Sequence, residues 1–179
     1  MATVAQRLAK WDSLLLCRVI ERTRGSRLNR VQWWISKSAD GHAYPALLVT
    51  LALVDPRYWK AVIAASVLSF GLELTIYKAV KQWVRRERPF HKISGIKHLI
   101  APPDLFSFPS GHTAAAFLVA TLIAHYCPSG AALAYLWAAS VGFSRVYLGV
   151  HYPTDVAAGA LIGSMSAEAG CLLGALFWG

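Results

Sequence analysis

Long apolar segments constrain the fold of this chain more than any other feature. Five of them, residues 43–59, 61–80, 109–126, 130–146 and 155–178, are each near the length that crosses a hydrocarbon core of about 30 Å. Hydrophobic residues make up 56% of the chain and charged residues only 15%, which is wrong for a soluble domain and typical of a polytopic membrane protein. The last segment is rich in Gly and Ala, which let helices approach closely in lipid. We therefore predict about five membrane spans.

The first 42 residues have a different pattern, both basic and amphipathic. Apolar residues such as Trp11 and Leu15 alternate with Arg18 and Arg22 at roughly helical spacing. Basic residues and Trp on an amphipathic helix are typical of a segment that lies in the membrane interface. An ordinary helix packed on the domain is the alternative. We predict an interfacial segment over residues 1–42 and a membrane-embedded domain over residues 43–179.

The charge of the chain is strongly positive, with 18 Lys and Arg against 9 Asp and Glu and a net charge of +9. In a membrane protein this excess is typical of cytoplasmic loops and of contact with anionic headgroups. The basic residues flank the apolar spans and form no soluble basic face, so we do not expect nucleic acid as a partner. The three cysteines are odd in number and lack metal-ligand spacing, so we interpret them as small apolar residues.

The predicted topology brings the polar parts of the chain together. Five spans place residues 1–42, the polar segment 81–108 and the connection 145–155 on the same side of the membrane. Segment 81–108 is the only long polar stretch, and long connections in compact chains usually serve a function. We therefore expect the chemistry of the protein to lie at one face of the bundle.

A first motif, Phe108-Pro109-Ser110-Gly111-His112, opens the third span. Free N–H groups and the positive end of the helix dipole at a helix N-terminus bind phosphate oxygens. Gly111 lets the backbone approach an anion, and Ser110 adds a hydroxyl donor. His112 could donate a proton to a leaving alkoxide. A plain helix cap with a hydrogen-bonded histidine is the alternative.

A second motif joins Ser144-Arg145 to His151-Tyr152-Pro153-Thr154-Asp155. His151 and Asp155 are four residues apart, so the carboxylate can hold one ring nitrogen. The other nitrogen is then free to act as a nucleophile and form a phosphohistidine. Arg145 ends an apolar span, where a guanidinium requires an anionic partner. Taken alone, a His and an Asp at this spacing are more often a structural pair.

A third motif supplies two further cations, Lys81 and Arg88, which a helix would align on one face. Pro89 restricts Arg88 and ends the helix there. Together with Arg145 these residues could neutralise the charge of an in-line phosphoryl transition state, a task that metal ions perform elsewhere. We therefore expect no metal and no cofactor.

Other charged residues are open to two interpretations. We interpret Arg85, Arg86 and Lys92 as headgroup contacts or topology signals, and we keep Arg85 as a possible substrate contact. Glu73 lies inside a span, eight residues before Lys81, and intramembrane carboxylates are functional candidates by default. Glu73 could pair with a cation, bind a substrate hydroxyl or make a structural hydrogen bond.

The three motifs together resemble the three-part signature of the type 2 phosphatidic acid phosphatase superfamily, and no signature position is missing. The resemblance covers the chain from about residue 70 to residue 165 and implies an all-α bundle. It also implies that His151 is the nucleophile, Asp155 its partner and His112 the general acid. The positions that match the phosphate-binding residues of the family are Lys81, Arg88, Ser110, Gly111 and Arg145. Membrane members commonly have six spans and an outer-face site, whereas five spans are predicted here.

We predict an integral-membrane lipid phosphatase that removes a terminal phosphate from a phospholipid or a polyprenyl (di)phosphate through a phosphohistidine. Its partners would be this lipid phosphate and membrane lipids. A polyprenyl-linked phosphosugar phosphatase and a non-catalytic lipid-binding protein are alternatives. The haloperoxidases of the superfamily hold vanadate with the same residues but are soluble. Of the 18 Lys and Arg, 16 lie on the predicted active-site side, so the positive-inside rule favours the cytoplasmic face, within a bacterial inner membrane.

Overall fold

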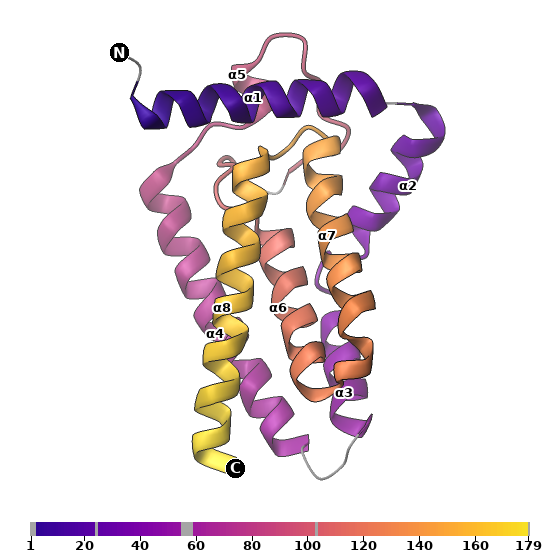
Figure 1. Cartoon of the computed structure of the whole chain (residues 1–179), viewed down its shortest axis with the longest axis vertical. Coiled ribbons are helices and arrows are strands. Elements are labelled where there is room, and N and C mark those ends of the chain that lie inside the picture. The colour runs from indigo at the N-terminus through magenta and orange to yellow at the C-terminus, as the bar shows by residue number, and fades with distance from the viewer. Residues whose placement is uncertain (1–2, 24, 55–58, 103, 179) are drawn as a thin grey trace.

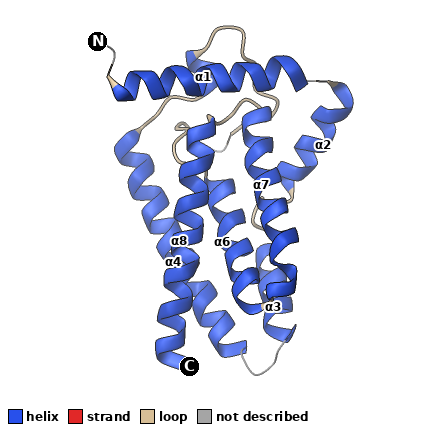
Figure 2. Cartoon of the chain, viewed as in Figure 1, coloured by secondary structure: helices blue, strands red, loops and turns tan. Residues whose placement is uncertain are grey.

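The chain folds into helices joined by short connections. The computed structural model describes residues 3–23, 25–54, 59–102 and 104–178. In these ranges the only β pairing is one isolated bridge between Glu87 and Phe106, and the all-α prediction is confirmed (Figure 2). The helices are α1 (Val4–Thr23), α2 (Ser26–Lys37), α3 (Tyr44–Val54), α4 (Trp59–Val84), α5 (Pro89–Lys92), α6 (Gly111–Tyr126), the 3₁₀ turn η1 (Pro128–Gly130), α7 (Ala131–Tyr147) and α8 (Pro153–Trp178).

The long helices form a bundle that α1 crosses at one end. Helices α4, α6, α7 and α8 run along the long axis, and α1 lies across their upper end (Figure 1), while α2 packs on α7 and α3 packs mainly on α4. Helix α8 has the most extensive contacts, with α4 and with α6. The connections 85–110 and 148–152 lie at the end of the bundle that α1 crosses, and the part of the first connection next to α5 reaches beyond α1 (Figure 1).

Close packing of α8 depends on its glycines. A Cβ at Gly159 would lie 2.5 Å from the carbonyl oxygen of Ser110, and one at Gly163 would overlap the carbonyl oxygen of Ala114. A Cβ at Gly170 would lie 2.7 Å from the carbonyl oxygen of Ala65 in α4. The small residues of the last span therefore let three backbones meet, as the sequence predicts. This contact sets the position of the start of α8 relative to the start of α6.

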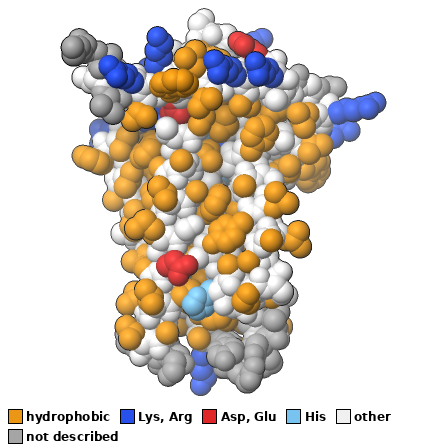
Figure 3. Space-filling model, viewed as in Figure 1, with side chains coloured by type: hydrophobic (Ala, Val, Ile, Leu, Met, Phe, Trp, Pro, Cys, Tyr) orange, Lys and Arg blue, Asp and Glu red, His pale blue; other side chains and the backbone are white. Residues whose placement is uncertain are grey.

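Within the described parts of the chain, two helices are long and apolar enough to cross a membrane, Trp59–Val84 and Pro153–Leu176. Helices α6 and α7 have 16 and 17 residues, and α3 is an 11-residue apolar helix. Figure 3 shows hydrophobic side chains over the flanks of the bundle and Lys and Arg side chains gathered around the end that carries α1. Large apolar residues such as Leu133, Leu161 and Leu176 are exposed on these flanks, as expected where lipid replaces water.

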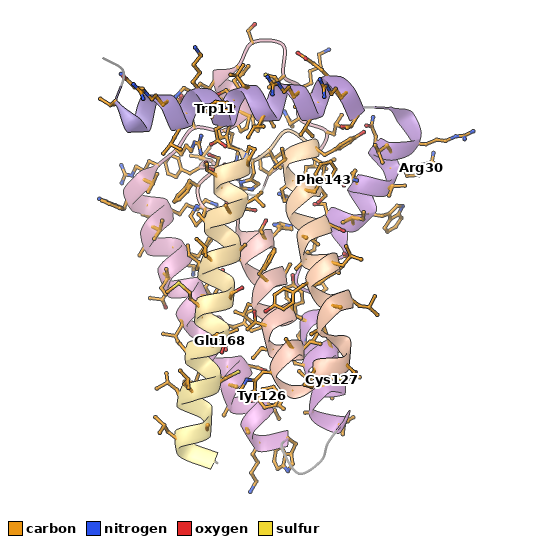
Figure 4. The ribbon with its side chains drawn as sticks, in the orientation of Figure 1. Trp11, Arg30, Tyr126, Cys127, Phe143 and Glu168 are labelled. Atoms are coloured by element: carbon orange, nitrogen blue, oxygen red, sulfur yellow. The ribbon has the colours of Figure 1, made fainter. Side chains whose placement is uncertain are left out.

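Of the five predicted spans, only the second and the fifth correspond, among the described residues, to helices that are long and apolar enough to cross a membrane, so the number of spans stays a prediction. Helix α4 continues to Val84, so the first part of the polar segment is helical and Lys81 lies in its last turn. The N-terminal residues form two helices, and Leu16 of α1 packs against Val146 and Tyr152. On the other side of α1, Trp11 is 61% exposed (Figure 4).

Candidate active site

All three sequence motifs meet beneath α1. Helix α4 supplies Lys81 in its last turn, α6 supplies His112 in its first turn, and α7 supplies Arg145 in its last turn. The remaining residues come from the connections and from the start of α8. Apart from the partly exposed Gly111 and His112, the catalytic and phosphate-binding candidates are buried: Lys81, Arg88, Ser110, Arg145, His151 and Asp155. The convergence that the predicted topology requires is therefore present in the fold.

His151 has a defined tautomer. Its Nδ1–H donates to the carbonyl oxygen of Ser107 at 2.7 Å, which leaves Nε2 unprotonated, 3.4 Å from Nη1 of Arg88. Burial, helped by the positive charges of Arg145 and Arg88 and opposed by Asp155, lowers the pKa of His151 to about 4. The ring is therefore neutral at physiological pH, and Nε2 carries an available lone pair.

Asp155 holds His151 less directly than the sequence predicts. Its Oδ2 lies 3.6 Å from Nδ1 of His151, farther than the carbonyl oxygen of Ser107. The same oxygen accepts a hydrogen bond from the backbone N–H of Tyr152 at 2.8 Å. Because Pro153 is the first residue of α8, this bond is the reciprocal half of a capping box, and it uses the carboxylate to begin the helix. Asp155 is thus a helix cap and a buried negative charge beside the ring.

Arg86 links Asp155 to the N-terminal helix. Its Nη1 donates to Oδ1 of Asp155 at 2.7 Å, and its Nη2 donates to Oδ2 of Asp12 in α1 at 2.6 Å. Asp12 also accepts hydrogen bonds from the backbone N–H and the hydroxyl of Thr154. The guanidinium lies 3.8 Å above the ring of Tyr152. The interpretation of Arg86 as a headgroup contact is therefore wrong, because two buried carboxylates hold it inside the site.

Asp104 bridges two of the predicted phosphate-binding cations. Its Oδ1 accepts from Nη2 of Arg88 at 2.7 Å, and its Oδ2 accepts from Nζ of Lys81 at 2.7 Å. Burial alone would raise the pKa of Asp104, but the hydrogen bonds and charges of Lys81 and Arg88 outweigh burial and hold this pKa below its usual value. The site thus carries its own carboxylate where two cations converge.

The start of α6 is arranged as an anion site. The helix begins at Gly111, so the amides of its first turn have no carbonyl partner within the helix. Ser110 precedes it, and its hydroxyl lies 2.9 Å from that of Thr113. A Cβ at Gly111 would lie 3.0 Å from the ring of Tyr77, so a larger residue would also crowd this wall of the site.

His112 and Arg145 have partners in the N-terminal segment that sequence reasoning missed. Nε2 of His112 lies 3.0 Å from Oδ1 of Asp40, whose Oδ2 pairs with Lys37 at 2.6 Å. Nη1 of Arg145 donates to Oγ of Ser36 at 2.6 Å, while its buried Nε has no hydrogen-bond partner among the described residues. Nothing in the pattern of residues 1–42 singles out these partners, because they act across the fold.

Two candidates of the sequence lie apart from this cluster. Arg85 is exposed, and its Nε donates to the carbonyl oxygen of Gln82. Glu73 is buried in α4, two helical turns before Lys81, and makes no ion pair with any residue that the structure describes. Glu168, a further carboxylate within the last predicted span, lies on the lower half of α8, far from the end that α1 covers (Figure 4).

A cavity of about 420 Å³ adjoins the cluster. It lies beside His112 and Arg145, and the N-terminal segment forms much of its wall. The remaining lining residues are Trp33, Ser36, Lys37, Asp40, His42, Ile100 and Ala101. A substrate headgroup can therefore reach both His112 and Arg145 from this side.

Comparison with known proteins agrees with this geometry. The model of the PAP2 superfamily matches residues 58–177, and the chain belongs to this superfamily. The chain is 37% identical over 117 residues to the decaprenylphosphoryl-5-phosphoribose phosphatase of Mycolicibacterium smegmatis, which covers 64% of this chain and 61% of that protein. It is 30% identical over 150 residues to the undecaprenyl-diphosphatase of Sulfolobus acidocaldarius, which covers 83% of this chain and 72% of that protein.

A solved structure shows the same fold. The transmembrane PAP2-type phosphatidylglycerolphosphate phosphatase from Bacillus subtilis superimposes with a TM-score of 0.75 and 26% identity, over 96% of this chain and 87% of that one. The resemblance predicted from the three motifs is confirmed. The chain is an integral membrane protein and a phosphoric ester hydrolase of the PAP2 type.

Proposed function

We propose that the protein removes a terminal phosphate from a membrane lipid through a phosphohistidine on Nε2 of His151, without a metal ion. The observation that carries this proposal is the state of His151: a neutral ring, a protonated Nδ1 and an Nε2 that faces Arg88. A buried neutral imidazole at the edge of a cation cluster is suited to attack an anionic phosphorus centre.

The first step forms one bond and breaks one. Nε2 of His151 attacks phosphorus while the bond from phosphorus to the lipid oxygen breaks, and His112 gives its proton to that oxygen. Lys81, Arg88 and Arg145 neutralise the transferring phosphoryl group, and the first-turn amides of α6 donate to its oxygens. Fixed cations and helix amides aimed at developing charge are an effective source of transition-state stabilisation.

The second step restores the enzyme. A water molecule attacks the phosphorus of the phosphohistidine, His112 takes a proton from this water, and inorganic phosphate leaves with the bond to Nε2 broken. Asp155 stabilises the positive charge that His151 carries while it is bonded to phosphorus, because its carboxylate lies 3.6 Å from Nδ1.

The substrate class follows from the membrane setting and from the relatives. We propose a phospholipid or polyprenyl phosphate or diphosphate, in line with the names of the two curated relatives. A polyprenyl-linked phosphosugar is the second candidate. The cavity beside His112 favours it, because Trp33, Lys37 and His42 offer an aromatic face and polar groups to a hydrophilic leaving group.

The membrane arrangement is part of the proposal. We propose that α3, α4, α6, α7 and α8 span the bilayer and that α1 and α2, in residues 1–42, lie in the interface above the domain of residues 43–179. Helix α1 lies across the bundle, as an interfacial helix would (Figure 1). The basic residues gathered at this end support a site at the cytoplasmic face of a bacterial inner membrane (Figure 3).

Phosphate release by purified protein in detergent tests the proposal. The panel is dioleoyl phosphatidic acid, phosphatidylglycerophosphate, undecaprenyl diphosphate and a polyprenyl-linked phosphosugar, each with and without EDTA. We expect activity that resists EDTA and is inhibited by orthovanadate, whose trigonal-bipyramidal form mimics the transition state. His151→Ala should lose several orders of magnitude in rate, and His112→Ala nearly as much. Full activity of His151→Ala, or loss of wild-type activity in EDTA, would refute the mechanism.

A further inference from the structure

The residues that hold His112 lie outside the part of the chain that matches the superfamily. The match begins at residue 58, whereas Asp40 lies in the connection between α2 and α3. Its Oδ1 is 3.0 Å from Nε2 of His112, and its Oδ2 is 2.6 Å from Nζ of Lys37. A carboxylate with one oxygen on the ring and the other on an ammonium has a fixed orientation.

We propose that Asp40 is a positioning residue that orients His112 and raises its affinity for the proton that it transfers to the leaving group. Asp40 accepts the Nε2–H of the ring, so Nδ1 is the nitrogen that donates to the leaving oxygen. The proton on Nδ1 goes to the lipid alkoxide as the bond from that oxygen to phosphorus breaks. The attacking water later returns a proton to Nδ1, so His112 ends the cycle as it began. This inference rests on the proposed function.

The charges around His112 show why such a carboxylate is needed. Burial of the ring disfavours an imidazolium most, the guanidinium groups of Arg145 and Arg88 disfavour it further, and Asp40 opposes them. Asp40 is the carboxylate in contact with the ring among the described residues, and Lys37 lies on its far side, with its side chain 51% exposed. A general acid that is buried and feels two fixed cations needs a negative partner to favour its protonated form.

Asp40 itself stays ionised. Burial alone would raise its pKa, but the hydrogen bonds from Lys37 and His112 outweigh burial and hold this pKa below its usual value. Asp40 and His112 also line the same cavity. The leaving group can therefore occupy the space beside the ring while Asp40 remains in place.

Leaving groups of different quality separate proton donation from folding. An alkoxide needs a proton to depart, whereas 4-nitrophenolate departs without one. We expect Asp40→Asn to lower the kcat for dioleoyl phosphatidic acid by roughly 10-fold to 100-fold, within the range that general acids contribute. On 4-nitrophenyl phosphate the loss should be under about 3-fold, because proton donation contributes little to that reaction. Asparagine keeps the size and the acceptor oxygen, so the fold is preserved.

Asp104→Asn is the matched control in the same site. Asp104 contacts Lys81 and Arg88 and does not contact His112, so its replacement should change the kcat for both substrates by the same factor. A second readout uses phosphatidic acid alone: Asp40→Asn should move the basic limb of the kcat/KM profile to lower pH, because His112 loses its negative partner.

The outcomes are separable. Wild-type protein that hydrolyses neither substrate would remove the proposed function itself. If the wild-type protein is active, two results would overturn only the role of Asp40. One is an Asp40→Asn variant whose kcat falls by the same factor on both substrates, and the other is a variant whose kcat/KM profile keeps its basic limb at the wild-type pH. Tighter orthovanadate inhibition of Asp40→Asn would also overturn it, since Asp40 would then be a competitor for the phosphate position.

Discussion

Replacement of Arg86 by methionine tests the network that ties α1 to the site. Arg86 lies between Asp12, which is 2% exposed, and Asp155, which is fully buried, at 2.6 and 2.7 Å. Methionine keeps most of the length and removes the charge, so two buried carboxylates lose their shared cation. Breaking a buried pair in this way costs about 3–5 kcal/mol. We use the lower value, because the side chain of Arg86 is 23% exposed.

A loss of about 3 kcal/mol corresponds to a drop of roughly 6–12 °C in melting temperature for a chain of this size. Thermal unfolding in detergent, followed by near-UV circular dichroism, measures this drop. The neighbouring Arg85→Met is the matched control, because Arg85 is exposed and outside the cluster, and its melting temperature should change by less than about 1 °C.

A double-mutant cycle then assigns the loss to the network. In Asp12→Asn/Arg86→Met one of the two stranded charges is gone, so the double variant should recover at least about 1 kcal/mol relative to the sum of the single variants. Two results would refute the reasoning: a melting temperature of Arg86→Met within about 1 °C of wild type, or single-variant costs that simply add.

Four further outcomes are expected. Asp155→Asn should fold and turn over slowly, since the amide keeps the size and loses the charge that stabilises phosphorylated His151; a variant that fails to fold would make Asp155 purely structural. The pKa of His151 is lowered to about 4, so the neutral, nucleophilic form of its ring should be lost only as pH falls through about 4. After correction for the ionisation of the substrate phosphate, an acid limb of the kcat/KM profile near pH 6.5, the pKa of an unperturbed histidine, would contradict this. Gly163→Leu should abolish stable protein in detergent, because its side chain would enter the backbone of α6 at Ala114, and a folded, active variant would show that α8 packs elsewhere. The end of α8 lies opposite the end that α1 covers, so a cytoplasmic active site would put a reporter fused after Gly179 outside the cytoplasm. Alkaline phosphatase fused there should therefore be active. Fluorescence of a cytosol-only reporter at the same position would place the active site at the outer face instead.

Much of the site could be predicted because its parts are local. The spacing of His151 and Asp155 is set by the start of one helix, and Ser110, Gly111 and His112 are consecutive at the start of another. Hydropathy alone then predicts that these helix ends lie on one side of the membrane. The three motifs therefore identified the superfamily before any contact was known.

The errors concern charged residues whose partners are distant. Arg85 and Arg86 are adjacent and identical in type, so no pattern could tell that Arg86 faces two carboxylates while Arg85 faces solvent. The predicted bond between Asp155 and His151 is weaker than expected, because the carboxylate also caps α8. The carbonyl oxygen of Ser107 takes the ring proton, and a backbone acceptor leaves no trace in residue types.

By itself the sequence determined the all-α class, the apolar helices and the set of histidines and cations that meet at one end, because hydropathy and spacing along a helix are short-range properties. Only the tertiary structure decided which carboxylate serves which cation or histidine. Asp40 is 72 residues from His112, and Asp12 is 74 residues from Arg86. Both contacts exist because α1 lies across the end of the bundle and α2 packs back along α7. The balance of charge in a buried site depends on distances in space, which the order of residues along the chain does not record.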